Sequence, residues 1–361
     1  MTVDTTPQFR PADRSVEPIQ FVNESGELQD GAVPSLDDDG VRRGVRLMML
    51  ARAFDAKSFS LQRQGKLGTF APCVGQEACT AGSGLALDPS FDWIVPQYRE
   101  LPAQINHGFP LELIALYRMG HPAGGVVPDG VRMLQFNISL AAQIPHAVGL
   151  GWGMQMKGEP GVAVAYFGDG ASSEGDFHES CNLAGVNKSP VIFFLQNNQW
   201  AISTPRDIQS NASDLASRAV GYGIHGVSVD GNDLLAVHQV TTEARQRALA
   251  GEGPTLIEAH TFRMWAHTTA DDPTKYIDPD VKAKWLARDP IDRMCAYLTQ
   301  RGAFDETERH ALQGEVEAEV EDVFVKVNEM LKVSPDEVFE HTFASRTPSQ
   351  ERQRQFDLGE A

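Results

Sequence analysis

An open α/β fold, with a mostly parallel sheet and helices on both faces, is predicted by two features of the sequence. The first is a series of short apolar runs, at 162–167, 191–196, 224–229 and 256–262, which is typical of strands in a buried parallel sheet. The second is the spacing: more than 20 residues with helical periodicity separate the first two runs, and also the last two. Parallel strands need such crossovers, so the pattern predicts strand–helix–strand units.

The N-terminal part is expected to be a tail, an arm and a long helix. Residues 1–16 are polar and contain prolines, which indicates a flexible tail, and 18–28 alternates as an extended arm that ends in a turn. Ser35 and the aspartates that follow it can cap a helix, which should end before Gly65. The apolar stripe of this helix is expected to comprise Val41, Val45, Met48, Met49, Phe54 and Phe59.

After Asp278 the sequence is expected to be helical. Apolar residues recur every three or four positions between acidic ones, and we expect this stripe to pack against the sheet or against another subunit. The stripe consists of Leu312, Val316, Val320, Val323, Val327 and Met330. We therefore expect a single α/β domain at 17–345, including the arm and the C-terminal helices, followed by a polar tail at 346–361.

The composition excludes several classes of protein. With 361 residues, 42% of them apolar and 22% charged, the chain is long enough for one large or two ordinary globular domains. Its formal charge of −18 argues against nucleic acid or an anionic membrane surface as the main partner. The cysteines form no CxxC pair, which argues against a zinc ribbon and a disulfide framework. Neither a signal-peptide core nor an apolar run of about 18 residues occurs, so we expect a cytoplasmic protein.

Polar residues follow two of the predicted strands directly. The motif GDG, Gly168-Asp169-Gly170, comes after the run at 162–167, and the motif NN, Asn197-Asn198, follows the run at 191–196. The carboxyl ends of parallel strands meet at one edge of a sheet, where open α/β folds bind ligands. A carboxylate, an amide oxygen and a backbone carbonyl suit Mg²⁺, which completes its shell with water and phosphate oxygens. Glycines allow close approach of a diphosphate, and the following helix directs its N-terminus at the negative charge. The sequence thus predicts a metal-bridged diphosphate site.

The GDG and NN motifs resemble the signature of thiamine-diphosphate enzymes. The surrounding sequence is similar to the alpha subunit of the decarboxylating first component of 2-oxo acid dehydrogenase complexes. The supporting stretches are QRQGKLGTFAPCVGQEA at 62–78, FNISLAAQIPHAVG at 136–149 and FRMWAHTTADDPTKY at 262–276. The resemblance implies a thiamine-diphosphate-binding fold, with thiamine diphosphate and Mg²⁺ as cofactors.

The resemblance also implies roles for individual residues. The side chains of Asp169 and Asn198 and the carbonyl of Trp200 would bind Mg²⁺. Contacts to thiamine diphosphate would be made by Gln97, Tyr98, Arg99, Leu140, Gly168, Asp169, Gly170, Asn198 and His267. His267 and Arg263 would be catalytic, with His267 near the reactive centre during acyl transfer to a lipoyl group.

The missing half of such a site must come from a second chain, because only the metal-binding half of the signature is present. The resemblance implies a beta subunit, an α2β2 heterotetramer and a lipoyl-bearing dihydrolipoyl acyltransferase core. The preferred substrate is a small branched-chain 2-oxo acid of the 3-methyl-2-oxobutanoate type, and the alternative is pyruvate. A metal-dependent phosphate-ester enzyme and a non-catalytic scaffold subunit remain lower alternatives.

Overall fold

The computed structural model describes residues 17–332, 334–340 and 342–359, so the tail predicted at 1–16 lies outside the described residues. Its centre is a parallel five-stranded sheet with the order β1-β2-β3-β7-β6. These strands are β1 (Trp93–Val95), β2 (Ala163–Gly168), β3 (Val191–Asn197), β6 (His225–Asp230) and β7 (Thr255–His260). A small antiparallel pair, β4 (Trp200–Ala201) and β5 (Thr204–Pro205), follows β3. The predicted α/β fold with a parallel sheet is confirmed.

The four predicted strands are present, each within two residues of its expected ends. Strand β1 was not predicted, because three residues carry no periodicity that distinguishes a strand from a loop. The order of the strands could not be read from the chain either: β7, the last in sequence, lies between β3 and β6.

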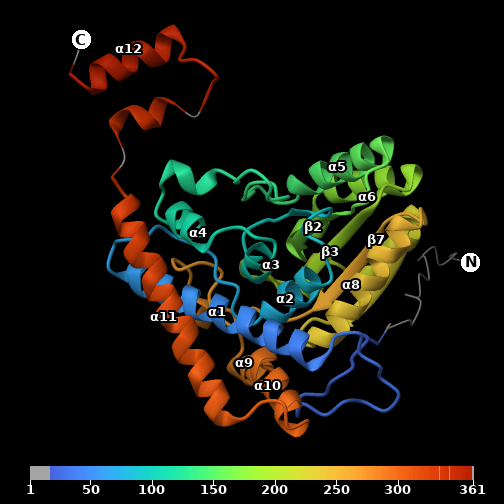
Figure 1. The fold of residues 1–361 in the computed structure, drawn as a ribbon. Helices are drawn as coiled ribbons and strands as arrows, with labels where there is room; N and C mark the ends of the chain where they lie inside the picture. The colour runs from blue at the N-terminus through green and yellow to red at the C-terminus, as the bar shows by residue number, and fades with distance from the viewer. Residues whose placement is uncertain (1–16, 333, 341, 360–361) are drawn as a thin grey trace, which may run out of the picture.

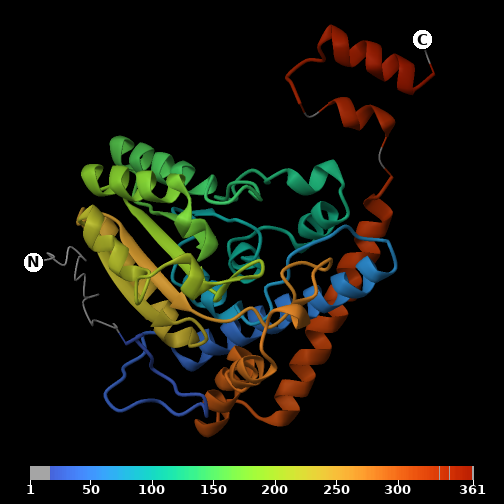
Figure 2. The ribbon, with the colours of Figure 1, turned by 180° about the vertical axis from the view of Figure 1, so that it is seen from behind.

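Helices cover both faces of the sheet (Figures 1 and 2). One face is covered by α5 (Gln143–Lys157), α6 (Gly175–Asn187) and the 3₁₀ segment η3 (Ala216–Tyr222). The other face carries α1 (Asp38–Arg63), α2 (Glu77–Leu85), α3 (Leu101–Asn106), α4 (Leu111–Arg118), α8 (Leu234–Leu249) and α10 (Pro290–Gln300). Side chains alternate between the two cores as strand geometry requires: Phe193 and Leu195 point to one, Ile192 and Phe194 to the other.

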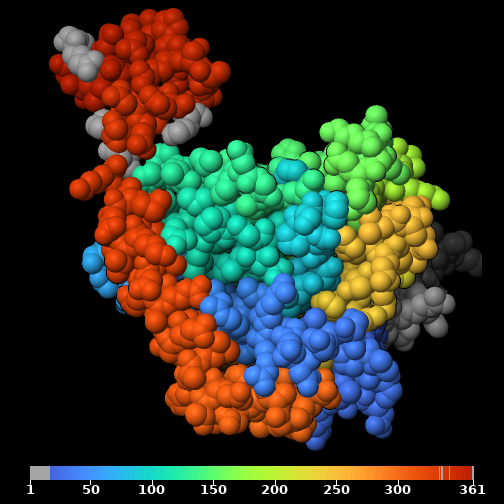
Figure 3. Space-filling view, in the orientation of Figure 1, coloured from blue at the N-terminus to red at the C-terminus, as the bar shows by residue number. Residues whose placement is uncertain are grey.

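The remaining elements connect these layers or extend from them. They are η1 (Pro122–Gly125), η2 (Gly170–Ser173), α7 (Arg206–Gln209), η4 (Pro273–Lys275), α9 (Pro279–Leu286), α11 (Glu306–Met330), η5 (Pro335–Phe339) and α12 (Pro348–Asp357). Helix α12 falls in the range predicted to be a polar tail, and it stands away from the body together with η5 (Figures 1 and 3).

Helix α1 confirms the predicted cap and stripe. The Asp37 carboxylate accepts a hydrogen bond from the Gly40 N–H at 2.9 Å and so satisfies one free donor of the first turn. The helix ends at Arg63, just before Gly65. Its predicted apolar residues are buried except Phe59, which is half-buried.

The apolar stripe of α11 does not pack on the sheet; other helices cover most of it. It contacts α1 and α4, and Phe324 stacks on Phe54 with 5.3 Å between ring centroids. The expectation of packing on the sheet was wrong because α1, α2, α3 and α8 already cover that face, so α11 forms a further layer outside them. At its C-terminal end Met330 is exposed.

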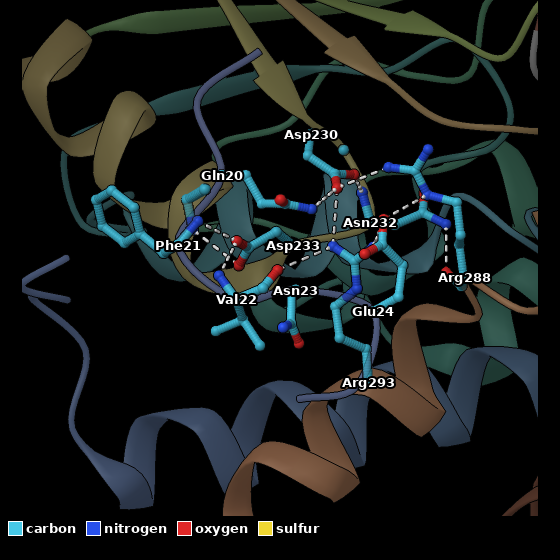
Figure 4. Close-up of polar contacts among 12 residues, drawn as sticks. Gln20, Phe21, Val22, Asn23, Glu24, Asp230, Asn232, Asp233, Arg288 and Arg293 are labelled. Carbon is cyan, nitrogen blue, oxygen red and sulfur yellow. Dashed lines mark hydrogen bonds and ion pairs between the residues drawn. The ribbon is translucent and has the colours of Figure 1, made fainter. Parts of the chain in front are cut away.

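The N-terminal arm is fixed to the far edge of the sheet by buried charges (Figure 4). The Asp233 carboxylate accepts hydrogen bonds from the backbone N–H groups of Phe21 and Val22, at 2.6 and 2.7 Å. Arg293 and Arg288 pair with Asp230 at 2.9 and 3.0 Å. Ile19 also forms a parallel bridge with β6, in which its N–H donates to the Ser228 carbonyl and its carbonyl accepts from the Asp230 N–H. The arm is thereby held against β6 and α8.

Two general properties follow from the described residues. No helix in them is long and apolar enough to cross a membrane. All four cysteines, Cys73, Cys79, Cys181 and Cys295, are buried and unpaired.

Candidate functional site at the carboxyl edge of the sheet

The GDG and NN motifs meet at one cavity. Strands β2 and β3 are parallel neighbours with Gly168 opposite Gln196, so the residues that follow them emerge at the same edge of the sheet. A cavity of about 150 Å³ lies there. Among the residues that line it are Gln97, Tyr98, Arg99, Leu140, Gly168, Asp169, Gly170, Asn198, Trp200 and His267. Every residue expected to contact the cofactor or the metal is therefore in one place; of the expected site residues, only Arg263 is not among the lining residues.

Asp169 is a buried carboxylate, only 2% exposed. Its Oδ2 accepts a hydrogen bond from Gln209 Nε2 at 2.8 Å, and no ion pair to it is found among the described residues. Burial raises its pKa to about 6, although Gln209 and the more distant Arg263 act in the opposite direction. A carboxylate without a direct cationic partner is destabilised in such surroundings, and a bound divalent cation would stabilise it.

Asn198 lies on a tight loop that leads into the β4–β5 hairpin, and Trp200 is the first residue of β4. The Trp200 N–H donates to Asn198 Oδ1 at 3.2 Å. Gln199 and Ile202 have left-handed backbones, with φ of 72° and 55°, which is strained for a β-branched residue such as Ile202. A Cβ at Gly170 would lie 2.7 Å from that of Ala201, so the missing side chain permits the GDG turn and the hairpin to approach each other.

Gln97, Tyr98 and Arg99 form the loop after β1 and bring a buried cation to the cavity. Arg99 is 6% exposed, and its Nη2 donates to the carbonyl of His267 at 2.7 Å. The guanidinium also donates to the carbonyl of Pro72 and lies beside the ring of Tyr98. Gln97 Nε2 is buried with no hydrogen-bond partner among the described residues. A buried donor without a partner beside a buried guanidinium fits an anion.

Two arginines determine the state of His267. Its Nδ1 lies 3.0 Å from Arg99 Nη2 and 3.4 Å from Arg263 Nη1, and both of these nitrogens are donors. Nδ1 must therefore accept, which leaves the ring proton on Nε2. Burial, Arg99 and Arg263 together lower the pKa of His267 to about 4. His267 is thus a neutral imidazole whose N–H is on Nε2.

Arg263 lies behind the wall of the cavity. It is 1% exposed, and its Nη2 donates to the carbonyl of Ile202 and to the hydroxyl of Tyr276, both at 2.7 Å. Burial, followed by the neighbouring Arg99, lowers the pKa of Arg263. Within the described chain neither arginine forms an ion pair with a carboxylate, although the acidic residues Asp169 and Glu100 line the same cavity.

Sequence reasoning missed several residues of the cavity. They are Gln76, Glu100, Ala171, Gln196, Ala201 and Ile202. Glutamines and a glutamate at these positions follow no spacing rule that would distinguish them from surface residues. What marks Gln76, Glu100 and Gln196 is burial, which only the folded chain reveals.

A larger apolar cavity adjoins the first. Its volume is about 350 Å³, and it shares Tyr98, Leu140 and His267 with the smaller cavity. Most of its other lining residues are aromatic or aliphatic, including Phe70 and Phe136, and Gln104 and Arg118 are among the polar ones. The two cavities together offer a charged end and an apolar end on either side of His267.

Any metal at this edge would depend on mixed oxygen ligands. The described residues contain no group of three or more histidines, cysteines, aspartates or glutamates arranged to hold an ion. Asp169 would have to be assisted by the Asn198 amide, the Trp200 carbonyl and ligand oxygens. These are hard oxygen donors, which Mg²⁺ prefers.

Comparisons with known proteins give the same assignment. Residues 45–336 match the family described as "Dehydrogenase E1 component". The chain is 42% identical over 326 residues to "Pyruvate dehydrogenase E1 component subunit alpha" of Bacillus cereus, which covers 90% of this chain and 88% of that relative. The protein of the same name from Staphylococcus aureus (strain COL) is 43% identical over 306 residues, 84% of this chain and 82% of its own. This chain belongs to the dehydrogenase E1 component family.

Proposed function

We propose that this chain is the alpha subunit of a pyruvate dehydrogenase E1 component, which decarboxylates a 2-oxo acid with the help of thiamine diphosphate and Mg²⁺. The proposal rests on one observation above all: Asp169, Asn198, Trp200 and Arg99 line a single cavity at the carboxyl edge of the sheet. The similarity to relatives named pyruvate dehydrogenase favours pyruvate, which our sequence analysis gave as the alternative, over the branched-chain acid that it preferred.

The described residues fit a metal-bound diphosphate. Asp169, the Asn198 amide and the Trp200 carbonyl would hold Mg²⁺, which would stabilise the buried Asp169 carboxylate. Arg99 and the unpartnered Gln97 amide would bind diphosphate oxygens, and Gly168 and Gly170 leave room for them. When bound, thiamine diphosphate supplies the nucleophilic carbon and the electron sink that decarboxylation needs.

His267 would act as a neutral hydrogen-bond donor. Its Nδ1 accepts from Arg99 and Arg263, so its Nε2–H is free to donate to a substrate oxygen or to hold the proton exchanged during acyl transfer. Arg263 would act through His267 and through the carbonyls of Trp200 and Ile202, which accept from its Nη1 at 3.4 Å and its Nη2 at 2.7 Å. We therefore assign Arg263 a positioning role in place of the direct one that the sequence suggested.

A second polypeptide is needed to complete this site. The cavity of about 150 Å³ is smaller than the roughly 300–1,000 Å³ of ordinary cofactor pockets. Apolar side chains near it are solvent-exposed, namely Leu140 (43%), Ile138 (64%) and Ile202 (55%). Exposed apolar groups around a binding site indicate a surface covered by a partner. We assign that place to a beta subunit, in an α2β2 assembly that passes its acyl group to a lipoyl-bearing acyltransferase.

A branched-chain 2-oxo acid remains the second candidate because of the neighbouring cavity. Its volume of about 350 Å³ and its apolar lining, including Phe70, Phe136 and Ile138, exceed what the methyl group of pyruvate requires. A partner subunit could fill part of this space, which is why the volume alone does not outweigh the similarity to the pyruvate enzymes.

The test is turnover by the chain reconstituted with its beta subunit. With thiamine diphosphate and Mg²⁺, we expect kcat/KM to be higher for pyruvate than for 3-methyl-2-oxobutanoate. The reverse order would favour the branched-chain assignment. No turnover of either acid, together with no heat on titration of thiamine diphosphate and Mg²⁺, would refute the proposal and favour a phosphate-ester enzyme or a scaffold.

A further inference from the structure

A row of hydrogen-bonded, buried side chains, which we call the amide row, connects two walls of the cavity: Asn198, Gln76, Gln196 and Glu100. Asn198 Nδ2 donates to Gln76 Oε1 at 2.9 Å, and Gln76 Nε2 donates to Gln196 Oε1 at 3.1 Å. Gln196 Nε2 in turn donates to Glu100 Oε1 at 2.7 Å. All four side chains are buried, with exposures of 1% to 5%. They come from three segments of the chain: the turn before α2, the loop after β1, and the end of β3.

Glu100 is the last member of the amide row, because both of its carboxylate oxygens already accept hydrogen bonds. Its Oε2 accepts from the backbone N–H groups of Gln97 and Arg99, at 3.0 and 2.8 Å. Its Oε1 accepts from Gln196. An ionised carboxylate can only accept hydrogen bonds, whereas an amide side chain can present either its oxygen or its NH₂ group. Glu100 therefore fixes the orientation of Gln196.

The orientation of each amide in the row then determines the orientation of the next. Because Gln196 must present NH₂ to Glu100, it presents its oxygen to Gln76. Gln76 then presents NH₂ to Gln196 and its oxygen to Asn198. Asn198 is left with NH₂ directed toward Gln76 and with Oδ1 directed away from it. Among the described residues this Oδ1 accepts only from the Trp200 N–H, so a second lone pair remains.

We propose that Glu100, Gln196 and Gln76 are positioning residues that hold the Asn198 amide with its oxygen toward the metal, while Glu100 also fixes the diphosphate-binding loop at 97–99. This inference deepens the proposed function and depends on it for the identity of the ligand. The orientation of the amide row itself does not depend on any cofactor.

Exchanging acid and amide between the two ends of the row tests the proposal. In Glu100→Gln the new side chain must keep its oxygen on the two backbone N–H groups, so its NH₂ faces Gln196. The row then inverts and Asn198 presents NH₂ to the metal. In Asn198→Asp alone, both ends demand NH₂, and two intervening amides cannot satisfy both. The double variant Glu100→Gln/Asn198→Asp restores a consistent, inverted row at unchanged net charge, with a carboxylate oxygen at position 198 available to the metal.

The first measurement is calorimetric titration of thiamine diphosphate at saturating Mg²⁺ into the complex with the beta subunit. We expect Glu100→Gln to raise the Kd about 10- to 100-fold, as changes behind metal ligands usually do. Asn198→Asp should also bind thiamine diphosphate more weakly than the parent, and the double variant should bind it more tightly than either single variant. The control is Asp233→Asn. Asp233 is equally buried and also accepts two backbone N–H groups, those of Phe21 and Val22, but it lies at the far edge of the sheet and does not line the cavity. This control should leave the Kd unchanged.

The second measurement needs no cofactor. In the cofactor-free complex, Asn198→Asp should lower the unfolding midpoint more in the parent than in the Glu100→Gln background, although the two residues do not touch. The proposal would be overturned if the midpoint shifts of the two substitutions were additive, or if the Glu100→Gln complex bound thiamine diphosphate as tightly as the parent. If the parent itself binds no thiamine diphosphate, the proposed function fails, and the midpoints still decide the relay. If neither the Glu100→Gln nor the Glu100→Gln/Asn198→Asp complex assembles, Gln196→Met is used to interrupt the row instead. An unchanged Kd for Gln196→Met would overturn the proposal.

Discussion

Acid should destabilise the folded chain through His267, and the variant His267→Asn should remove this effect. Burial, followed by Arg99 and Arg263, lowers the pKa of His267 to about 4 and so holds it neutral. In the unfolded chain its pKa returns to about 6.5. Between pH 6.5 and pH 4 the unfolded state therefore binds more protons than the folded state, so stability falls as the pH is lowered through this range. An asparagine at this position keeps an oxygen that can accept from Arg99 but cannot be protonated.

The size of the effect follows from the two pKa values. A difference between about 6.5 and about 4 corresponds to roughly 3 kcal/mol at ~1.4 kcal/mol per pH unit. His267 is partly exposed, and solvent screening reduces electrostatic contributions of this kind, so we expect about 1–2 kcal/mol. For a chain of 361 residues that is a shift of about 1–3 °C in the unfolding midpoint.

The assay compares unfolding midpoints of parent and His267→Asn complexes at pH 7.5 and pH 4.5. Many carboxylates also titrate in this range, so only the difference between the two proteins is informative. We expect the parent to lose more stability than the variant on acidification. Parallel losses would show that His267 is not held neutral in the folded chain, and its assignment as a neutral Nε2–H donor would fall with it.

Two further predictions concern the GDG turn and the loop before α2. Asp169→Asn should raise the unfolding midpoint of the cofactor-free protein, because it replaces a poorly solvated carboxylate and keeps an acceptor for Gln209. The same variant should lose Mg²⁺-dependent cofactor binding. A midpoint below that of the parent would contradict the stability prediction. Gly75→Ala should be strongly destabilising, by about 3 kcal/mol or more, because φ is 95° and the new Cβ would lie 2.2 Å from the carbonyl of Phe262. Gly65→Ala is its control, with φ of 73° and no atom within 4 Å, and should cost only about 1 kcal/mol in chemical denaturation; equal losses would show that the clash at position 75 is relieved.

The candidate site was predictable to the extent that its residues lie directly after strands. Asp169 and Asn198 could be paired because parallel neighbours end at one edge, and residues 97–99 and 267 followed from the resemblance. The relay of Gln76, Gln196 and Glu100 could not be predicted in this way. Its hydrogen bonds join residues 96 to 122 positions apart, and polar side chains carry no periodic signal for such pairing.

What the sequence alone determined is local: buried runs that must be strands, crossovers long enough to make them parallel, a capped amphipathic helix from Asp38 to Arg63, and oxygen-bearing residues at the ends of two strands. These follow from the chain because backbone hydrogen bonding and side-chain periodicity act between near neighbours. Only the tertiary structure decided that β7 lies between β3 and β6, that α11 packs on α1, and that Arg263 lies behind the cavity wall. These depend on which apolar faces and buried charges find one another across the whole chain, and burial that brings together distant segments leaves no regular spacing in the sequence.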